Sequence, residues 1–505
     1  CIENCSEHEF CPRPTQGCLP TRIVDCIDPQ RPRLVTGDSS MRAFYVALSY
    51  VWGQDQPHRT TAYNIEAYHA FIDRRYIPKT VQDAITITKG LGVRYLWVDS
   101  FCIMQDSDED KAQEIEKIRI YFRNAYVTII AANAERVSEG FLHDPPKWYQ
   151  PHLELPFWSP DGQLGTMLLY RTYADWPTRD QPVDRRAWCL EERILSPRRL
   201  LFCSHALQFE CQKTRVNVNG SPLGLPDMYP RLPDYTFTHD ETKSVLDRSE
   251  AEEGELVGDW DRALNDYTGR RLTKSKDKLV AITGVAEQFQ LFWPQSRYIA
   301  GLWTHQFPEA LLWYVETGLE SQPMPLPRPT TYRAPSWSWA AVDGAVETLR
   351  WIPLAQDIDS FCTIKHCEAH LKRETNPYSE VESGWLLLEA EEMVVEWEPM
   401  RGWGKIHSLF KMVKPGQLPT LPLGASTNQE QSTIGQINPD SSEFLDSERH
   451  QVVLAGVLKG TRSIFGLALV AVCNEGSTIH RRIGLIRVDN EHWTPSEAHR
   501  TFHIV

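Results

Sequence analysis

No apolar run in this 505-residue sequence approaches the roughly 20 residues that a membrane-spanning helix needs. We therefore expect no membrane span, and the cysteine usage described next favours a cytoplasmic protein. Positive charge is also scarce, because 53 Lys and Arg residues stand against 67 Asp and Glu residues and leave a formal net charge of −14. That balance argues against nucleic acid as a partner and against docking on an anionic membrane.

The twelve cysteines form no framework of tight repeats, and several lie in apolar runs. This usage favours reduced thiols over disulfides. Four metal-ligating side chains do fall close together near the start: Cys5, His8, Cys11 and Cys18. Their spacing, C-x2-H-x2-C-x6-C, is not a standard zinc pattern. We treat these four residues as candidate ligands of a structural zinc ion and expect no other cofactor.

The sequence is well supplied with residues for packing, since 41% are hydrophobic and 17 are tryptophan. A chain of this length exceeds what one hydrophobic core usually serves, so two or three domains are expected. Composition and patterning divide the sequence into an N-terminal Cys/His-containing segment over 1–40, a first domain over 41–212 with an insertion at 140–184, a helical region over 213–330, and a β-rich region over 331–505 with a mobile loop at 413–446.

Strands alternate with helices in the first domain. The segments FYVALSYVWG (44–53), RYLWVDSFCI (94–103) and YVTIIAAN (126–133) have the continuous apolar character of buried strands, and helical spacing separates them. This alternation predicts an α/β fold with a mostly parallel sheet and helices on both faces. The C-terminal region is predicted to be mixed α+β and rich in antiparallel strands.

Polar and aromatic residues follow the predicted strands at their carboxyl ends, where ligands bind in such sheets. These residues are Ser49, Trp52, Gly53, Asp99, Cys102 and Asn133. We expect a ligand pocket there, although burial of Trp52 in the core is an equally open alternative.

The segment RRAWCLEERIL (185–195) predicts a short amphipathic helix. Its apolar arc contains Glu191, and Glu192 lies at the rim, one turn from Trp188. Two interpretations are open for these acids: a functional carboxylate, or a buried salt bridge to Arg186 or Arg193.

Together these segments resemble fungal heterokaryon-incompatibility (HET) domain proteins. The blocks YVALSYVWG, YLWVDSFCIMQD, QEIEKIRIYFRNAYVTIIAA and RAWCLEERILSPRRLLF occur in the family's order over about 45–211, and RAPSWSWAAVDG follows. The resemblance implies a TIR-like (flavodoxin-like) fold and a role in fungal allorecognition and regulated cell death.

Many TIR domains hydrolyse the nicotinamide–ribose bond of NAD with the glutamate of a W-C-x-x-E helix, which is Glu192 here. The resemblance therefore implies an NAD(P) glycohydrolase, with Glu192 as the catalytic carboxylate and Glu191 as an alternative or a partner. A tryptophan would stack on a ring and an arginine would meet the pyrophosphate. The candidate substrate-binding residues are Ser49, Trp52, Gly53, Asp99, Cys102, Arg186, Trp188 and Arg193.

Two features depart from the relatives: the family usually has Gln at the position of Glu191, and a typical TIR domain lacks the insertion at 140–184. TIR domains also signal through self-association. The alternative is therefore a non-enzymatic module that assembles with itself or with other death-signalling proteins. A metal-dependent hydrolase that uses the early Cys/His group or the acidic stretch 106–114 is a third reading.

Overall fold

The computed structural model describes residues 1–37, 40–143, 153–158, 161–169, 181–204, 206–218, 220, 230–234, 236–237, 248–317, 324–349, 359–374, 376–400, 407–411, 435–445, 450–474, 477–493 and 499–505. The chain divides into two compact units, residues 1–259 with 287–289 and residues 260–286 with 290–505.

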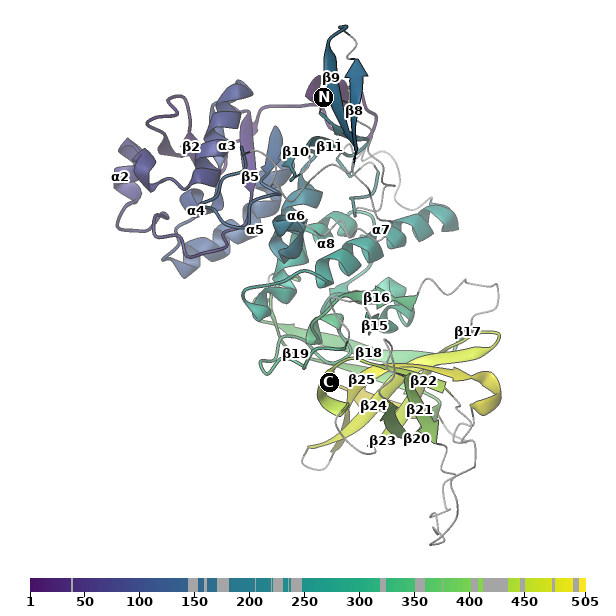
Figure 1. Ribbon diagram of the computed structural model, residues 1–505. Helices are drawn as coiled ribbons and strands as arrows, with labels where there is room; N and C mark the ends of the chain where they lie inside the picture. Colours follow the sequence, from purple (N-terminus) through teal and green to yellow (C-terminus); the bar gives the residue numbers. More distant parts are fainter. Residues whose placement is uncertain are drawn as a thin grey trace. The chain divides into compact units, whose positions relative to one another are not determined.

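The first unit is built on a mixed sheet, to which the described residues contribute eight strands in the order β12-β11-β10-β7-β5-β6-β2-β3 (Figure 1). In chain order the strands are β2 (Arg22–Asp25), β3 (Arg33–Thr36), β5 (Tyr45–Ser49), β6 (Tyr95–Trp97), β7 (Val127–Ile130), β10 (Arg198–Phe202), β11 (Leu207–Cys211) and β12 (Arg215–Asn217).

Only the centre of this sheet is parallel. Strands β6, β5, β7 and β10 run parallel, and if numbered along the chain they lie in the order 2-1-3-4. The outer strands β2, β3, β11 and β12 pair antiparallel. The sheet is thus mixed, and the expectation of a mostly parallel sheet is corrected. Antiparallel neighbours need only short turns, so segments flanking the α/β core extend both edges.

Helices connect the parallel strands. They are α2 (Ile65–Ala70) and α3 (Lys79–Gly90) before β6, α4 (Asp99–Cys102) and α5 (Asp108–Asn124) before β7, and α6 (Ala187–Leu195) before β10. Right-handed crossovers place α3 on one face of the sheet and α5 and α6 on the other. Helices α5 and α6 contact each other, and Figure 1 shows them side by side.

Side chains of β5 and β6 pack against α5 in the core of the first unit. The hydroxyl of Tyr45 donates to the carbonyl oxygen of Tyr121 in α5 at 2.7 Å. The indole of Trp97 packs against the rings of Tyr121 and Phe122. Trp97 is 1% exposed, which confirms that this mid-strand tryptophan belongs to the core.

The remaining elements of the first unit are short. Helix α1 (Ile2–Cys5) opens the chain, and β1 (Gly17–Cys18) pairs with β4 (Arg42–Ala43). The described part of the insertion contains an antiparallel hairpin, β8 (Leu153–Trp158) with β9 (Leu164–Leu169). A 3-10 turn at Pro182–Arg185 leads into α6.

The second unit is rich in antiparallel strands, as predicted. Helices α7 (Glu250–Thr268) and α8 (Thr283–Gln290) fall at the boundary between the units along the chain. Its strands are β13 (Tyr298–Ile299), β14 (Leu302–Trp303), β15 (Trp313–Val315), β16 (Val346–Thr348), β17 (Asp359–Ser360), β18 (Cys362–Leu371), β19 (Val381–Ala390), β20 (Glu392–Met400), β21 (His407–Lys411), β22 (Gly435–Pro439), β23 (His450–Lys459), β24 (Ser463–Asn474), β25 (Ser477–Asp489) and β26 (Arg500–Ile504).

The large sheet of this unit follows the order β18-β19-β26-β25-β24-β23-β20-β21, with β17 joined to β23 and β22 joined to β25. Much of the predicted loop 413–446 lies outside the described residues. Its last part contains β22, which pairs with β25, so the loop expectation is wrong there. The region predicted to be helical also contains strands β13, β14 and β15.

A buried ion pair fixes the sheet of the second unit to its neighbours. The guanidinium of Arg482 binds Asp440 at 3.0 Å, and both side chains are 0% exposed. The same guanidinium lies 3.5 Å from the centre of the Trp313 ring and donates to the carbonyl oxygen of Leu311. Among the described residues, no helix is both long and apolar enough to cross a lipid bilayer.

Candidate active site at the strand ends

The carboxyl ends of β5 and β6 meet around one carboxylate. Asp99 lies two residues after the end of β6 and begins α4. Its Oδ1 accepts hydrogen bonds from the Tyr50 hydroxyl at 2.8 Å and from the backbone N–H of Ser100 at 2.6 Å. Its Oδ2 accepts one from the indole Nε1 of Trp52 at 2.9 Å. Two side chains from the end of β5 therefore hold an acid from the end of β6.

The start of α6 is anchored to the same place. Nη1 of Arg186, the residue before the helix, donates to the carbonyl oxygen of Tyr50 at 3.1 Å. The thiol of Cys189 points to the same oxygen at 3.8 Å. One turn further along, Glu192 faces Ser49 at the end of β5. Helix α6 thus brings a second carboxyl group to the strand ends.

Burial, with a smaller contribution from the nearby Asp99, raises the pKa of Glu192 to about 7, although Ser49, Arg186 and Cys189 act in the opposite direction. Among the described residues, neither Oε2 of Glu192 nor Oγ of Ser49 has a hydrogen-bond partner of good geometry, and both atoms are buried. Leaving a buried polar atom unpaired costs about 1–3 kcal/mol. Such a cost is typical of a site prepared for a ligand.

Burial also shifts the pKa values of the other charged groups of the cluster, Asp99 and Arg186. Burial raises the pKa of Asp99, against the lowering effects of Tyr50, Arg186 and Trp52. Burial alone would lower the pKa of Arg186, but Cys189, Glu192 and Asp99 outweigh it and raise the pKa. The site therefore holds two acids with raised pKa values and one permanent cation, and Glu192 changes charge near neutral pH.

The structure brings together five of the residues that the sequence pointed to: Ser49, Trp52, Asp99, Arg186 and Glu192. Trp52 is partly exposed at the strand exit, and its N–H is committed to Asp99. Trp188 is also partly exposed, on α6. Stacking of either ring on a ligand stays a prediction.

Arg193 is placed elsewhere, in a buried ion-pair network. Its guanidinium donates to Glu210 at 3.0 Å and to Asp184 at 3.4 Å. Burial alone would raise the pKa of Glu210, but Arg193 and Arg199 lower it to about 2. Arg193 therefore pairs with these two buried carboxylates and does not join the cluster at the strand ends. A buried salt bridge is thus present at this arginine, with Glu210 and Asp184 as partners.

Glu191 is 4% exposed, as its position inside the apolar arc predicts. Cys102 is 0% exposed, and its sulfur accepts from the backbone N–H of Val98 at 3.4 Å, so it packs within α4. Asn133 donates from its backbone N–H to the carbonyl oxygen of Phe202 at 3.0 Å, which joins it to β10.

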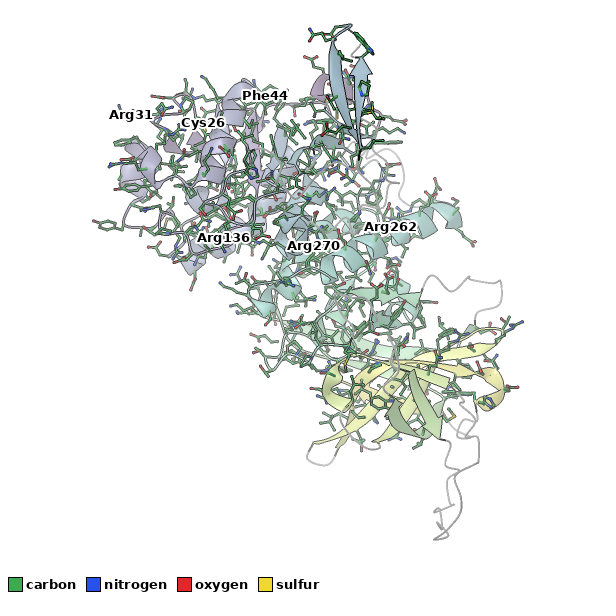
Figure 2. The ribbon with its side chains drawn as sticks, in the orientation of Figure 1. Cys26, Arg31, Phe44, Arg136, Arg262 and Arg270 are labelled. Carbon is green, nitrogen blue, oxygen red and sulfur yellow. The ribbon has the colours of Figure 1, made fainter. Side chains whose placement is uncertain are left out.

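Gly53 is needed for its backbone conformation. Its φ is +66°, and a Cβ there would lie 2.2 Å from the carbonyl oxygen of Glu135 and 2.8 Å from Cα of Arg136, which is labelled in Figure 2. Only glycine fits such a position without strain. The glycine allows the chain to turn sharply after β5 and to place Trp52 over Asp99.

Tyr50 and Cys189 were not singled out from the sequence. Tyr50 follows Ser49, the last residue of β5, and its hydroxyl bonds Asp99 at 2.8 Å and the Ser100 hydroxyl at 2.9 Å. Its position next to a polar strand end was the available signal. Cys189 lies between Trp188 and Glu192 and looked like an ordinary apolar position of the helix.

The metal-ligating side chains that meet in the structure differ from the expected set by one residue. Cys5, His8 and Cys11 lie together, but their fourth neighbour is Cys211 at the end of β11. Cys18 is exposed in β1, so the expected four-residue set is corrected at this position.

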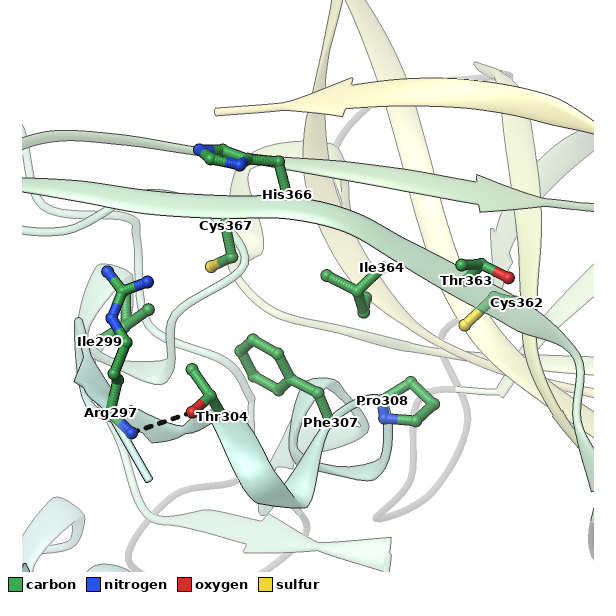
Figure 3. A pocket seen from close by; sticks show the side chains of 10 residues that line it. All are labelled: Arg297, Ile299, Thr304, Phe307, Pro308, Cys362, Thr363, Ile364, His366 and Cys367. Carbon is green, nitrogen blue, oxygen red and sulfur yellow. Dashed lines mark hydrogen bonds between the residues drawn. The ribbon is translucent and has the colours of Figure 1, made fainter. Parts of the chain in front are cut away.

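A cavity of about 490 Å³ lies in the second unit, between β18 and the segment 297–308 (Figure 3). Burial raises the pKa of both thiols that line it, Cys362 and Cys367, to about 12. Thiols that stay protonated are weak nucleophiles. His366 binds the exposed Glu368 at 3.3 Å, and Arg297 donates its backbone N–H to Thr304. This cavity shows no catalytic arrangement of these groups.

Comparison with known proteins gives one family. Residues 45–192 match the family described as Heterokaryon incompatibility protein (HET). No curated protein and no solved structure matches the chain. The match begins at β5 and ends at Glu192, so it contains the whole cluster at the strand ends. Residues 45–192 of this chain therefore form a heterokaryon-incompatibility (HET) domain.

Proposed function

We propose that the HET domain of this chain is a TIR-like NAD(P) glycohydrolase, which cleaves the nicotinamide–ribose bond. The family suggests a role in heterokaryon incompatibility and cell death, and depletion of a nicotinamide cofactor supplies a route to that outcome. The substrate is NAD or NADP, and no cofactor takes part in the reaction.

The strand order supports the TIR-like part of the proposal. The parallel strands lie in the order 2-1-3-4, which is the order of the first four strands in flavodoxin-like sheets. Ligands of such sheets bind at the carboxyl ends beside the first and third strands, here β5 and β7. Ser49 ends β5, and Glu192 faces it from the helix that follows β7.

The observation that carries the proposal is the state of Glu192. Its carboxyl group is buried beside Asp99 and Arg186, its pKa is about 7, and its Oε2 has no partner of good geometry among the described residues. A cationic ligand at this position would favour the ionised carboxylate and would fill the unmet hydrogen bond. Nicotinamide ribosides provide both a positive charge and ribose hydroxyls.

The chemistry suits one ionised carboxylate. The bond between C1′ of ribose and N1 of nicotinamide breaks, its electron pair stays on nitrogen, and nicotinamide leaves neutral without a general acid. The ribosyl group becomes oxocarbenium-like, as in glycoside cleavage. Glu192 stabilises that cation and accepts hydrogen bonds from the ribose hydroxyls. Water then attacks C1′ and loses its proton, giving ADP-ribose or its phosphorylated counterpart.

The remaining groups of the site bind the substrate and orient its ribose and pyrophosphate. Asp99 is fixed by Tyr50, Trp52 and the N–H of Ser100, and is placed to hold ribose or to orient Arg186. Arg186 keeps its charge within the cluster and is the available partner for a pyrophosphate oxygen.

Release of nicotinamide from NAD, NADP and nicotinamide mononucleotide tests the proposal. We expect turnover by the wild-type chain, loss of roughly 100-fold or more in Glu192→Gln, and retention in Glu191→Gln. Loss of turnover in Glu191→Gln alone would assign the catalytic role to Glu191 instead of Glu192. Absence of turnover by the wild-type chain at every oligomeric size would remove the enzymatic proposal.

One observation favours the second candidate, a self-associating signalling module. The hairpin β8–β9 exposes large apolar side chains, among them Phe157, Trp158 and Leu164 at 41%, 67% and 62%. Apolar side chains gathered on one exposed hairpin mark an association surface. A second copy of this chain is the occupant that fits a self-assembling module. Sedimentation of wild type and Trp158→Ser over a concentration series tests it: association should weaken in the variant, and an unchanged distribution would exclude the hairpin.

A further inference from the structure

Three thiols and an imidazole from two distant parts of the chain meet at the end of β11, the second strand from one edge of the sheet. The ligand atoms of Cys5, His8, Cys11 and Cys211 all lie within 4.8 Å of one another. We propose that these four residues bind one structural Zn²⁺ ion, which fastens the N-terminal segment to the sheet. This site is independent of the chemistry at the strand ends.

The distances match a tetrahedral zinc site. Zn–S and Zn–N bonds of about 2.3 and 2.05 Å at tetrahedral angles require S···N separations of roughly 3.6 Å and S···S separations of roughly 3.8 Å. Sγ of Cys211 lies 3.5 Å from Nδ1 of His8, and Sγ of Cys11 lies 3.7 Å from the same nitrogen. These two separations are close to the tetrahedral values, and all four ligand atoms lie within 4.8 Å of one another.

Local structure explains how the first three ligands converge. Cys5, His8 and Cys11 are spaced by three residues, and two successive hydrogen-bonded turns connect them. The backbone N–H of His8 donates to the carbonyl oxygen of Cys5 at 3.2 Å, and that of Cys11 donates to His8 at 3.3 Å. Each turn returns the chain to the same side, so the side chains point to one place.

The fourth ligand, Cys211, is supported by the turn that follows its strand. The backbone N–H of Thr214 donates to Sγ of Cys211 at 3.4 Å, and the Thr214 hydroxyl lies 3.3 Å from the same sulfur. Donors of this kind stabilise a metal-bound thiolate and orient it. The surrounding side chains are apolar, with Phe209, Ile2 and Leu200 packed against the three cysteines.

The four ligand atoms favour zinc as the metal and a structural role for the site. Three sulfur atoms and one imidazole nitrogen suit Zn²⁺ and do not suit Mg²⁺ or Ca²⁺, which take oxygen ligands. Four protein ligands leave no open position for water, which is the arrangement of structural sites. The ion would connect residues 5–11 with residue 211 and replace core that a short irregular segment cannot build.

Metal analysis of the purified chain under reducing conditions tests the proposal. We expect about one zinc ion per chain, retained in Cys18→Ser and lost in Cys211→Ser. Cys18 is the matched control because it is exposed and lies outside the cluster. Zinc that is lost in Cys18→Ser and kept in Cys211→Ser would overturn the assignment.

Two measurements on the wild-type chain stand even where Cys211→Ser fails to fold. Replacement of the metal by Co²⁺ should give the intense visible absorption of tetrahedral cobalt with thiolate-to-cobalt charge transfer. X-ray absorption at the zinc edge should give about three sulfur neighbours and one nitrogen. A metal-free chain, or mass spectra showing a disulfide between two of these cysteines as isolated, would refute the site.

Discussion

The indole N–H of Trp52 donates a hydrogen bond of 2.9 Å to Oδ2 of Asp99, and so joins the exits of two neighbouring parallel strands. The bond gives Trp52 a definite role, because a tryptophan at a strand exit could as well have been plain core. It orients the carboxylate and counteracts the burial that raises the pKa of Asp99.

Trp52→Phe keeps an aromatic ring and removes only the N–H and part of the ring. Loss of a hydrogen bond to a charged group should lower the free energy of unfolding by about 1.5–3 kcal/mol at neutral pH. The loss should shrink at low pH, where Asp99 is protonated. Urea unfolding at several pH values measures it, and Tyr50→Phe, which removes the other side-chain donor to Asp99, should behave alike. A loss that is equal at every pH would show that the ring alone contributes.

Glu192 makes activity and stability respond to pH in opposite directions. Its pKa of about 7 in the folded chain exceeds the ordinary 4.5, so the folded state binds the proton more tightly than the unfolded state. The free energy of unfolding should therefore fall by about 3 kcal/mol as pH rises from about 4.5 to about 7, and this contribution should then level off.

Glu192→Gln lacks this component, because its amide is neutral at every pH. The variant should match the wild type near pH 4.5 and exceed it in stability at pH 8, by calorimetry or urea unfolding. Glycohydrolase activity of the wild type should rise through about pH 7, where the carboxylate forms. A variant that loses stability relative to wild type at pH 8 would contradict a buried, raised carboxyl group.

Arg193→Met should strongly destabilise the first unit. The change leaves Glu210 and Asp184 buried without this cation, and breaking a buried ion pair costs about 3–5 kcal/mol. Arg185→Met is the matched control, since Arg185 is half exposed and lies 3.9 Å from Glu135, and it should cost at most about 1 kcal/mol. Chemical denaturation measures both. Equal costs would show that the buried network contributes little.

Gly53→Ala should disturb the turn after β5. The new Cβ would meet the carbonyl oxygen of Glu135 at 2.2 Å in addition to the strain of φ +66°, so we expect a loss of more than about 2 kcal/mol. Gly92→Ala separates the two effects, because φ is +71° there and nothing lies within 4 Å. That control should lose only about 1 kcal/mol. Thermal unfolding of both variants gives the comparison.

Local patterns predicted the centre of the first unit well. Strands β5, β6 and β7 lie in the continuous apolar runs, and helices occupy the segments between them, as the helical spacing predicts. The helical wheel of α6 placed Glu191 in the core and Glu192 at its rim, which the burial of Glu191 confirms. The family resemblance is also confirmed, over residues 45–192.

Contacts between distant segments were beyond the same reasoning. Nothing in the spacing of the N-terminal cysteines points to Cys211, because the turn and strand that carry it are about 200 residues away. The partners of Arg193 lie in β11 and in the 3-10 turn before α6, so its removal from the strand ends depends on tertiary packing. Pairing of β2, β3, β11 and β12 at the sheet edges likewise follows from the assembled sheet.

The borders of the family match are not the borders of the folded sheet. Strands β2 and β3 precede residue 45, and β10, β11 and β12 follow residue 192, so five of the eight described strands lie outside the match. A recombinant fragment cut to 45–192 would leave the backbone N–H and C=O groups of β6 and β7 open along two sheet edges. Open edges of this kind recruit strands from other molecules and lead to aggregation. Fragments for expression should therefore begin before β2, at residue 1 if the Cys/His cluster is to be kept, and extend beyond Asn217.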